Sequence, residues 1–191
     1  MNDERLSRQI DFLGEIEKLK TVSRANRTTD GRAENSAEHS WHVALMALLL
    51  AEHADADLDW LRVTRMLLVH DIVEIDAGDT WLYAADQGSK PEAENRAAER
   101  LYALLPDDQY ADYLLLWREF EARETDEAKF AAAIDGLQPL LNHLLTGRAD
   151  ERVIAAGEVL AKKAYIRDCA PALWPLVERL VRDSRDKGLY D

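Results

Sequence analysis

The chain has 191 residues, of which 47% are hydrophobic, and this suits one domain over residues 1–191 with a sizeable core. Its formal net charge of −13 and its scattered Lys and Arg argue against a nucleic-acid-binding protein, which needs a basic surface. The amino-terminal stretch is charged where a signal peptide is apolar, and no apolar run approaches the roughly 18 residues of a membrane span. We therefore expect a cytoplasmic protein that does not bind membranes.

Hydrophobic residues recur at helical spacing along nearly the whole chain, and no alternating run predicts a strand. The expected fold class is therefore all-α. A polar loop with Gly31 separates the first two helices, Ser36 is the expected N-cap of the second, and Pro139 predicts a kink near Asp135. The expected helices lie at about 6–19, 36–50, 61–75, 91–105, 108–123, 126–145, 150–166 and 171–185.

In the third expected helix an apolar run, Met66 to Val69, leads directly into the pair His70 and Asp71. His39 lies at the start of the second helix, and Asp135 lies on an otherwise apolar helix. Buried imidazoles and carboxylates cost several kcal/mol unless they are paired, so this set needs a common partner. Two imidazoles and two carboxylates suit Mn²⁺, Fe²⁺, Co²⁺, Ni²⁺ or Zn²⁺, and suit Ca²⁺ less well.

Most of the other polar residues have simpler interpretations. We expect His42 and His143 to be hydrogen-bonded residues of the core, Asp76 to be solvated or a cap, and Cys169 to be a small buried residue. The loop before the second helix carries three arginines that solvation alone could explain: Arg24, Arg27 and Arg32. One alternative is an acidic helical protein that binds no metal. Four candidate ligands in apolar surroundings argue against it. The ordered combination of two histidines and two aspartates favours the metal site.

That ordered combination resembles the HD-domain metal-dependent phosphohydrolases, and specifically their bacterial 5′-deoxynucleotidase-like branch, over nearly the whole chain. The resemblance rests on the motifs ENSAEHSWHVA, HDIVEIDAGD and AAAIDGLQPLL. It implies an HD-domain helical bundle with one divalent metal per chain, which could be Mn, Co, Fe, Ni, Zn or Mg. The implied metal ligands are His39, His70, Asp71 and Asp135. The resemblance also implies that Glu74 and Asp79 act on water and leaving group.

The loop arginine Arg24 falls where this family has a phosphate-binding arginine. In nucleotidase members the next residue is a tryptophan that helps to exclude ribonucleotides, whereas this chain has Ala25. We therefore predict weaker discrimination against the 2′-hydroxyl than in the tryptophan-bearing relatives.

These features predict a metal-dependent phosphomonoesterase that hydrolyses (deoxy)nucleoside 5′-monophosphates to nucleoside and phosphate. Two alternatives are a phosphohydrolase of another small phosphate ester or nucleoside polyphosphate, and a metal-containing nucleotide-binding module without turnover. Glu74 and Asp79 are not needed to hold a metal, so their presence favours an enzyme. The acidic surface would repel anionic substrates unless a local cation such as the metal reversed the field. Several helices are apolar on more than one face, so we expect a homo-oligomer, with a dimer favoured.

Overall fold

The computed structural model describes residues 3–83, 90–148 and 154–191. This part of the chain is almost entirely helical, which confirms the all-α prediction. Its α-helices are α1 Asp3–Ile16, α2 Ser36–Leu49, α3 Trp60–Val69, α4 Glu74–Ala77, α5 Lys90–Tyr102, α6 Asp107–Ala122, α7 Asp126–Thr146, α8 Ala156–Lys163, α9 Tyr165–Cys169 and α10 Trp174–Asp186. Short 3₁₀ turns lie at Glu17–Thr21, Ala51–His53, His70–Val73 and Pro171–Leu173. None of the described helices is long and apolar enough to cross a membrane.

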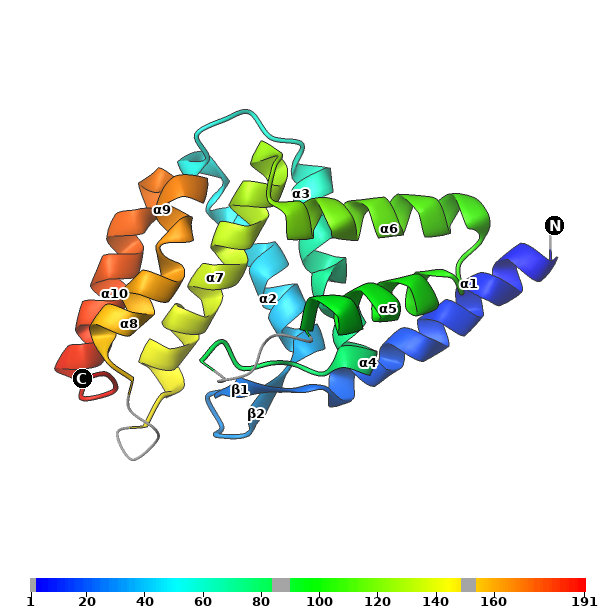
Figure 1. Cartoon of the computed structure of the whole chain (residues 1–191). Coiled ribbons are helices and arrows are strands. Elements are labelled where there is room, and N and C mark those ends of the chain that lie inside the picture. Colours follow the sequence, from blue (N-terminus) through cyan, green and yellow to red (C-terminus); the bar gives the residue numbers. More distant parts are fainter. Residues whose placement is uncertain (1–2, 84–89, 149–153) are drawn as a thin grey trace.

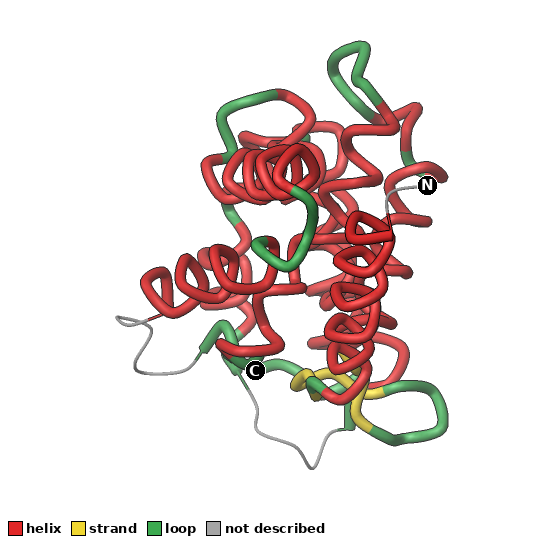
Figure 2. Tube along the Cα trace, turned by 90° about the vertical axis from the view of Figure 1, so that its right-hand side faces the viewer, coloured by secondary structure: helices red, strands yellow, loops and turns green. Residues whose placement is uncertain are grey.

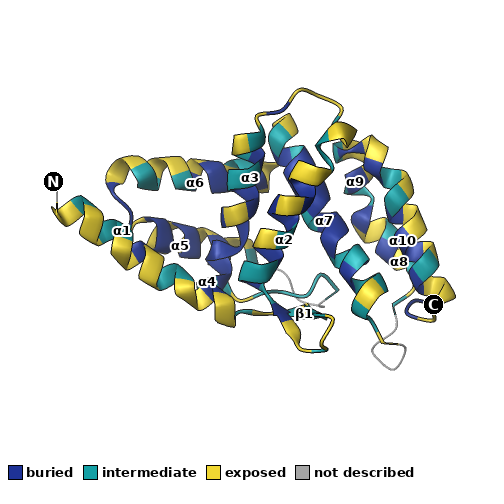
Figure 3. Cartoon of the chain, turned by 180° about the vertical axis from the view of Figure 1, so that it is seen from behind, coloured by how far each residue is buried: buried dark blue, intermediate teal, exposed yellow. Residues whose placement is uncertain are grey.

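Helix α7 is the centre of the bundle. It packs against α2, α3 and α6 on one side and against α9 and α10 on the other (Figure 1). Thr125 caps its first turn by accepting a hydrogen bond from the backbone N–H of Ala128. The helix continues through Pro139 as one element, and its middle turns are buried on almost every side (Figure 3). A side chain on these turns is therefore held by the core rather than by solvent.

The polar loop before α2 contains two strands that the sequence did not predict. Strands β1 Ser23–Arg27 and β2 Ala33–Asn35 pair antiparallel, and the turn between them contains Gly31, whose φ is +89°. Figure 2 shows this hairpin in yellow among the helices. The strands are short and mostly polar, so they lack the alternation of a half-buried strand. The hairpin fixes where the arginine-rich loop lies.

The third expected helix is interrupted. Helix α3 ends at Val69, residues His70–Val73 form a 3₁₀ turn, and α4 continues to Ala77 before Gly78, whose φ is +75°. A 3₁₀ turn winds by about 120° per residue instead of 100°. The side chains of His70 and Asp71 therefore leave the backbone in directions that a continuous α-helix would not give them.

The ends of the chain depart from the predicted helices in smaller ways. The expected helix 150–166 is divided into α8 and α9, and its predicted start at Asp150 lies outside the described residues. Cys169, which was expected to be buried, is half-buried at the end of α9. Helix α1 has the predicted amphipathic pattern, but Leu6 and Ile10 of its apolar stripe are each 57% exposed. A monomer of this chain therefore leaves much of that stripe in solvent.

Candidate active site

Three of the predicted metal ligands lie close together in the core of the bundle. His39, His70 and Asp135 each offer one ligand atom, and these atoms all lie within 4.8 Å of one another. The Nε2 atom of His39 is 2.9 Å from Oδ1 of Asp135, and Nε2 of His70 is 3.5 Å from the same oxygen. Asp71 joins the group, because its two oxygens lie 3.1 Å from Nε2 of His70 and 3.9 Å from Nε2 of His39. The set is drawn from α2, the 3₁₀ turn after α3, and α7.

The second nitrogen of each imidazole fixes the direction of the ring. Nδ1 of His70 lies 2.9 Å from the carbonyl oxygen of Leu67, and Nδ1 of His39 lies 3.1 Å from Oε1 of Gln138. Both partners are acceptors, so each Nδ1 carries a hydrogen and each Nε2 can turn a lone pair toward the centre. Nε2 of His70 is buried and makes no hydrogen bond within the described residues. A nitrogen prepared in this way fits a divalent metal ion.

The carboxylates of Asp71 and Asp135 favour the binding of a positive charge between the two imidazoles. Burial lowers the pKa of His70, but Asp71 and Asp135 outweigh burial and raise that pKa to about 9. Burial raises the pKa of Asp135, but its hydrogen bond with His39 and the charge of nearby His70 lower it well below the usual range. The cluster thus binds a proton tightly. A divalent metal ion would meet the same electrostatic demand and displace that proton.

A second layer of polar residues orients His39. The amide nitrogen of Gln138 donates a hydrogen bond of 2.7 Å to Glu34 and lies 3.3 Å from Nδ1 of His42, which leaves Oε1 of Gln138 to accept from His39. Glu34 is only 4% exposed and also accepts a hydrogen bond from Asn142. The carboxylate of Glu34 therefore fixes the orientation of Gln138 and, through it, that of the ring of His39. His42 has the structural role expected from the sequence.

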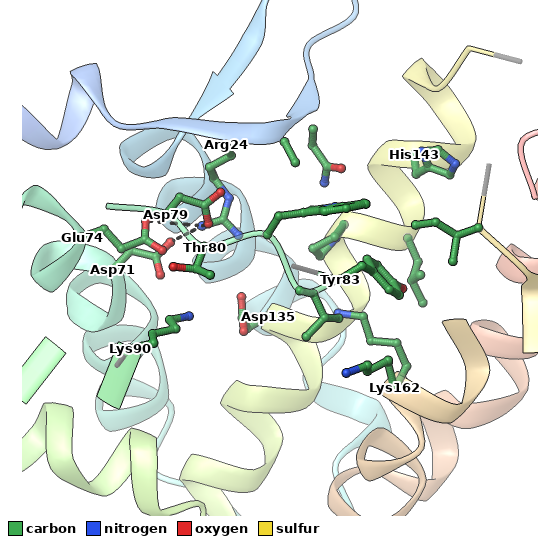
Figure 4. A pocket seen from close by; sticks show the side chains of 18 of the residues that line it. Arg24, Asp71, Glu74, Asp79, Thr80, Tyr83, Lys90, Asp135, His143 and Lys162 are labelled. Atoms are coloured by element: carbon green, nitrogen blue, oxygen red, sulfur yellow. Dashed lines mark hydrogen bonds and ion pairs between the residues drawn. The ribbon is translucent and has the colours of Figure 1, made fainter. Parts of the chain in front are cut away.

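The β-hairpin brings Arg24 into this carboxylate cluster (Figure 4). Its Nη1 lies 2.7 Å from Oδ2 of Asp71, 3.7 Å from Glu74 and 3.8 Å from Asp79. Burial lowers the pKa of Arg24, but these carboxylates outweigh burial and raise it, so the guanidinium remains charged. Arg24 was predicted to bind phosphate. The structure places it beside the predicted metal ligand Asp71, in ion pairs that a bound phosphate would have to share.

Glu74 is the predicted acid–base group beside the cluster. It is buried, and burial together with the charge of Asp71 raises its pKa to about 8. The hydroxyl of Ser36, at the start of α2, donates a hydrogen bond of 2.6 Å to Glu74. A carboxyl group whose pKa is near neutrality can both take and give a proton at physiological pH. Asp79 follows Gly78 and lies beside Glu74 and Arg24 in the same cluster (Figure 4).

The cluster opens into a cavity of about 560 Å³. One end is lined by the carboxylates and Arg24, and the other end is lined by aromatic rings. The rings of Trp81 and Tyr83 have centroids 5.3 Å apart, and those of His143 and Tyr190 are stacked at 4.7 Å. The volume falls within the usual range of sites for small ligands, and the two ends suit a molecule with one ionic and one planar part.

Comparison with known proteins agrees with this geometry. The family model for the HD domain matches residues 16–174. The chain belongs to the HD-domain family. It is 33% identical over 141 residues to 5′-deoxynucleotidase HDDC2 of Xenopus laevis, which covers 71% of this chain and 67% of that protein. A 5′-deoxynucleotidase of Pectobacterium atrosepticum is 28% identical over 153 residues, which covers 74% of this chain and 77% of that protein.

A solved structure resembles this HD-domain protein over almost its full length. The crystal structure of a predicted metal-dependent phosphohydrolase from Magnetospirillum magnetotacticum has a TM-score of 0.91 and is 46% identical. The match covers 98% of this chain and 96% of that one. A protein from Pyrococcus horikoshii has a TM-score of 0.71 at 20% identity, over 91% of this chain and 99% of that one, and shows the fold alone.

Some residues of the site were not recognised in the sequence. Glu34 and Gln138 lie within the quoted motifs, but their roles depend on contacts between segments far apart in the chain. The N-cap of α2 is Asn35, which forms a capping box with Glu38, and not Ser36 as predicted. Ser36 instead directs its hydroxyl to the acid–base carboxyl group. His143, expected in the core, lies in the wall of the cavity.

Proposed function

We propose that this HD-domain protein is a metal-dependent phosphomonoesterase that hydrolyses (deoxy)nucleoside 5′-monophosphates to nucleoside and phosphate. The observation that carries the proposal is a buried acid–base group, Glu74, beside a predicted metal-ligand cluster in a cavity that also has an aromatic end. A binding module needs the cluster but gains nothing from Glu74. The similarity to proteins named 5′-deoxynucleotidase supports the same conclusion.

The four clustered residues His39, His70, Asp71 and Asp135 would hold one divalent ion. Which of Mn, Co, Fe, Ni, Zn or Mg it is does not follow from the donor set, because mixed imidazole and carboxylate ligands suit several of them. When bound, such an ion withdraws electron density from phosphate oxygens and makes water easier to deprotonate.

The remaining groups have separate tasks in the proposed reaction. Glu74 takes the proton of the attacking water, since its pKa of about 8 lets it accept and later release a proton near neutrality. Arg24 holds the non-bridging phosphate oxygens, exchanging part of its ion pairs for contacts with the substrate. Asp79 assists the departing 5′-oxygen, which takes up a proton as the P–O bond breaks. The aromatic end of the cavity receives the base.

A phosphate-release screen tests this proposal. Ribo- and deoxyribonucleoside monophosphates are supplied with each of several divalent metals, alongside the variants Glu74→Gln and Asp135→Asn. Glu74→Gln should keep the metal and the fold while turnover falls by roughly 10² to 10⁴, the usual contribution of acid–base catalysis. Asp135→Asn should lose metal affinity and activity together, and excess Mn²⁺ or Co²⁺ should restore part of both.

Three results of this screen would contradict the proposal or one of its assignments. Tight nucleotide binding without phosphate release under any metal would identify a binding module instead. Release from nucleoside polyphosphates or other phosphate esters, but not from monophosphates, would keep the chemistry and change the substrate. If both variants lose the metal in parallel, Glu74 is a metal ligand or orients one. The proton-transfer role would then be assigned to Asp79.

We also propose that the chain forms a homodimer through α2. Helix α2 presents apolar side chains to solvent at the spacing of one helical face: Trp41, Leu45, Leu48 and Leu49, of which Trp41 is 62% exposed. Contiguous exposed apolar surface on a folded protein commonly marks an interface. Size-exclusion chromatography with light scattering should give a dimer for the wild type and a monomer for the double variant Trp41→Glu, Leu48→Glu. A monomeric wild type at micromolar concentration would refute it.

A further inference from the structure

Lys163 is a buried cation for which the proposed reaction has no use. It is the last residue of α8, it is only 7% exposed, and it lines the same cavity as the metal-ligand cluster. Within the described residues its ammonium group has neither a hydrogen bond nor an ion pair. A lysine that is mostly buried and has no carboxylate partner is uncommon, and here the side chain borders a cavity that could hold an anion.

Two more cations without carboxylate partners stand near Lys163. Arg123 and Lys162 line the cavity, and neither has an ion pair in the part of the chain that the structure describes. The guanidinium of Arg123 lies over the ring of Tyr165, 4.6 Å from its centroid. Arg123 also adopts a left-handed conformation, with a φ of +52°, at the end of α6. This is the C-cap of α6, a position where helices commonly end in a left-handed residue.

The other cations of the cavity differ in this respect. Arg24 is paired with the carboxylate cluster, and Lys90 lies 3.3 Å from Glu94. Of the three cations at this wall only Lys163 is buried, whereas Arg123 and Lys162 are exposed at its rim. Figure 4 shows the carboxylates and Arg24 on one side of Asp135, and Lys162 with Tyr83 on the other. The cavity thus has a cationic wall facing its carboxylate end.

We propose that Lys163, with Arg123 and Lys162 beside it, forms an anion subsite that binds a phosphate group of the substrate. Lys163 and Asp135 line the same cavity, so an anion bound at Lys163 shares that cavity with the predicted metal-ligand cluster. An ammonium group supplies three donors to phosphate oxygens and balances their charge. The subsite deepens the proposed function and rests on it only for the identity of the substrate.

The bound phosphate could come from either of two places on the substrate. In the first case, Lys163 and Arg24 hold the phosphate that is hydrolysed from opposite sides. In the second case, Lys163 holds a second phosphate group carried by the same nucleotide. Both have the same chemistry at Lys163. They differ in which substrates depend on it, and this difference can be measured.

The first experiment measures binding of inorganic phosphate to the metal-loaded protein by isothermal titration calorimetry. It compares the wild type with Lys163→Met, which keeps the length of the side chain, and with Lys163→Arg, which keeps the charge. Loss of a charged hydrogen bond should weaken binding by roughly 10- to 100-fold in Lys163→Met and by only a few-fold in Lys163→Arg. The matched control is Lys129→Met on α7, where the lysine pairs with Asp126, and it should bind phosphate like the wild type.

The second experiment measures KM and kcat for a nucleoside 5′-monophosphate and for the corresponding 3′,5′-bisphosphate. If the subsite holds the hydrolysed phosphate, Lys163→Met raises both KM values by a similar factor. If it holds a second phosphate, only the KM of the bisphosphate rises. Either result supports the subsite. Because phosphate binding needs no turnover, the first experiment still tests the subsite if no nucleotide is hydrolysed and the proposed function fails.

The subsite is overturned if Lys163→Met binds inorganic phosphate as tightly as the wild type and leaves both KM values unchanged. It is also overturned if both Lys163 variants lose binding in proportion to a loss of thermal stability. In that case the lysine supports the fold and not the ligand. Rescue by Lys163→Arg at an unchanged melting temperature is the result that a purely structural role would not give.

Discussion

Replacing Lys163 by methionine should make the metal-free protein more stable, which few substitutions at a buried polar residue do. Burial lowers the pKa of Lys163 from 10.5 to about 8. At about 1.4 kcal/mol per pKa unit, keeping this side chain charged inside the fold costs about 3 kcal/mol relative to the unfolded chain. Lys163→Met removes this cost and keeps most of the apolar packing, so we expect a gain of up to about 3 kcal/mol at pH 7.

The gain should depend on pH in one direction. Because the pKa of a base is lower in the folded state, the folded protein binds fewer protons than the unfolded chain between pH 8 and 10.5. The cost of the charge is therefore fully present below pH 8, decreases as the pH rises from 8 to 10.5, and is absent above that range. The free energies of unfolding of the wild type and Lys163→Met should converge over this interval.

Urea unfolding at pH 7, 9 and 10, followed by tryptophan fluorescence with a chelator present, measures this difference. The five tryptophans of the chain supply the signal. The control Lys129→Met, in which an exposed ion pair is lost, should change the free energy of unfolding by less than about 1 kcal/mol at every pH. A Lys163→Met variant that is less stable than the wild type at pH 7, or whose gain is the same at pH 7 and 10, would refute the reasoning.

Four further predictions concern the metal site and the cavity. His70→Ala should abolish binding of about one divalent metal per chain in elemental analysis; retention of the metal would remove this residue from the ligand set. Gln138→Leu takes away the acceptor of the Nδ1 hydrogen of His39, so metal affinity in a chelator competition should fall about 10- to 100-fold. Gly136→Ala places a methyl group against the tyrosine hydroxyl that packs on this glycine, and denaturant unfolding should show a loss of about 1–3 kcal/mol. Because Ala25 is small, the ratio of kcat/KM between deoxyribo- and ribonucleotides should stay below about 10³; a higher ratio would assign the selection to other residues.

The grouping of the predicted metal ligands could be anticipated because its signal is local. His39, His70, Asp71 and Asp135 are polar residues in apolar helical segments, and such residues need a partner wherever the helices lie. The sequence could not supply the break of the helix at His70–Val73, since no glycine or proline marks it. Tertiary packing against α5 and α2 determines that break.

The hairpin and its contacts could not be predicted from the sequence, for a different reason. Strands β1 and β2 are too short and polar to show a period, and what holds them is mutual pairing and the turn at Gly31. The ion pairs of Arg24 follow from that hairpin. The orientation of Gln138 by Glu34 joins residues 104 positions apart, and no local pattern encodes it.

The adjacent residues Lys162 and Lys163 differ strongly in their exposure to solvent. In the sequence they read as one solvated basic pair at the end of a helix, yet one is exposed and the other is buried at the cavity wall. Adjacent helical positions point about 100° apart, so the orientation of α8 against the bundle decides which of them enters. Packing against α10 and α9 sets that orientation.

The distribution of charge in the cavity resolves a difficulty posed by the composition. A chain with a net charge of −13 repels anions at long range, so an anionic substrate needs a local reversal of the field. The carboxylate cluster alone would deepen the repulsion, and a bound divalent ion together with Arg24 offsets only part of it. The cationic wall of Arg123, Lys162 and Lys163 faces the same cavity without carboxylate partners in the described residues. Keeping Lys163 unpaired costs stability in the free protein, and this cost is recovered only when an anion binds.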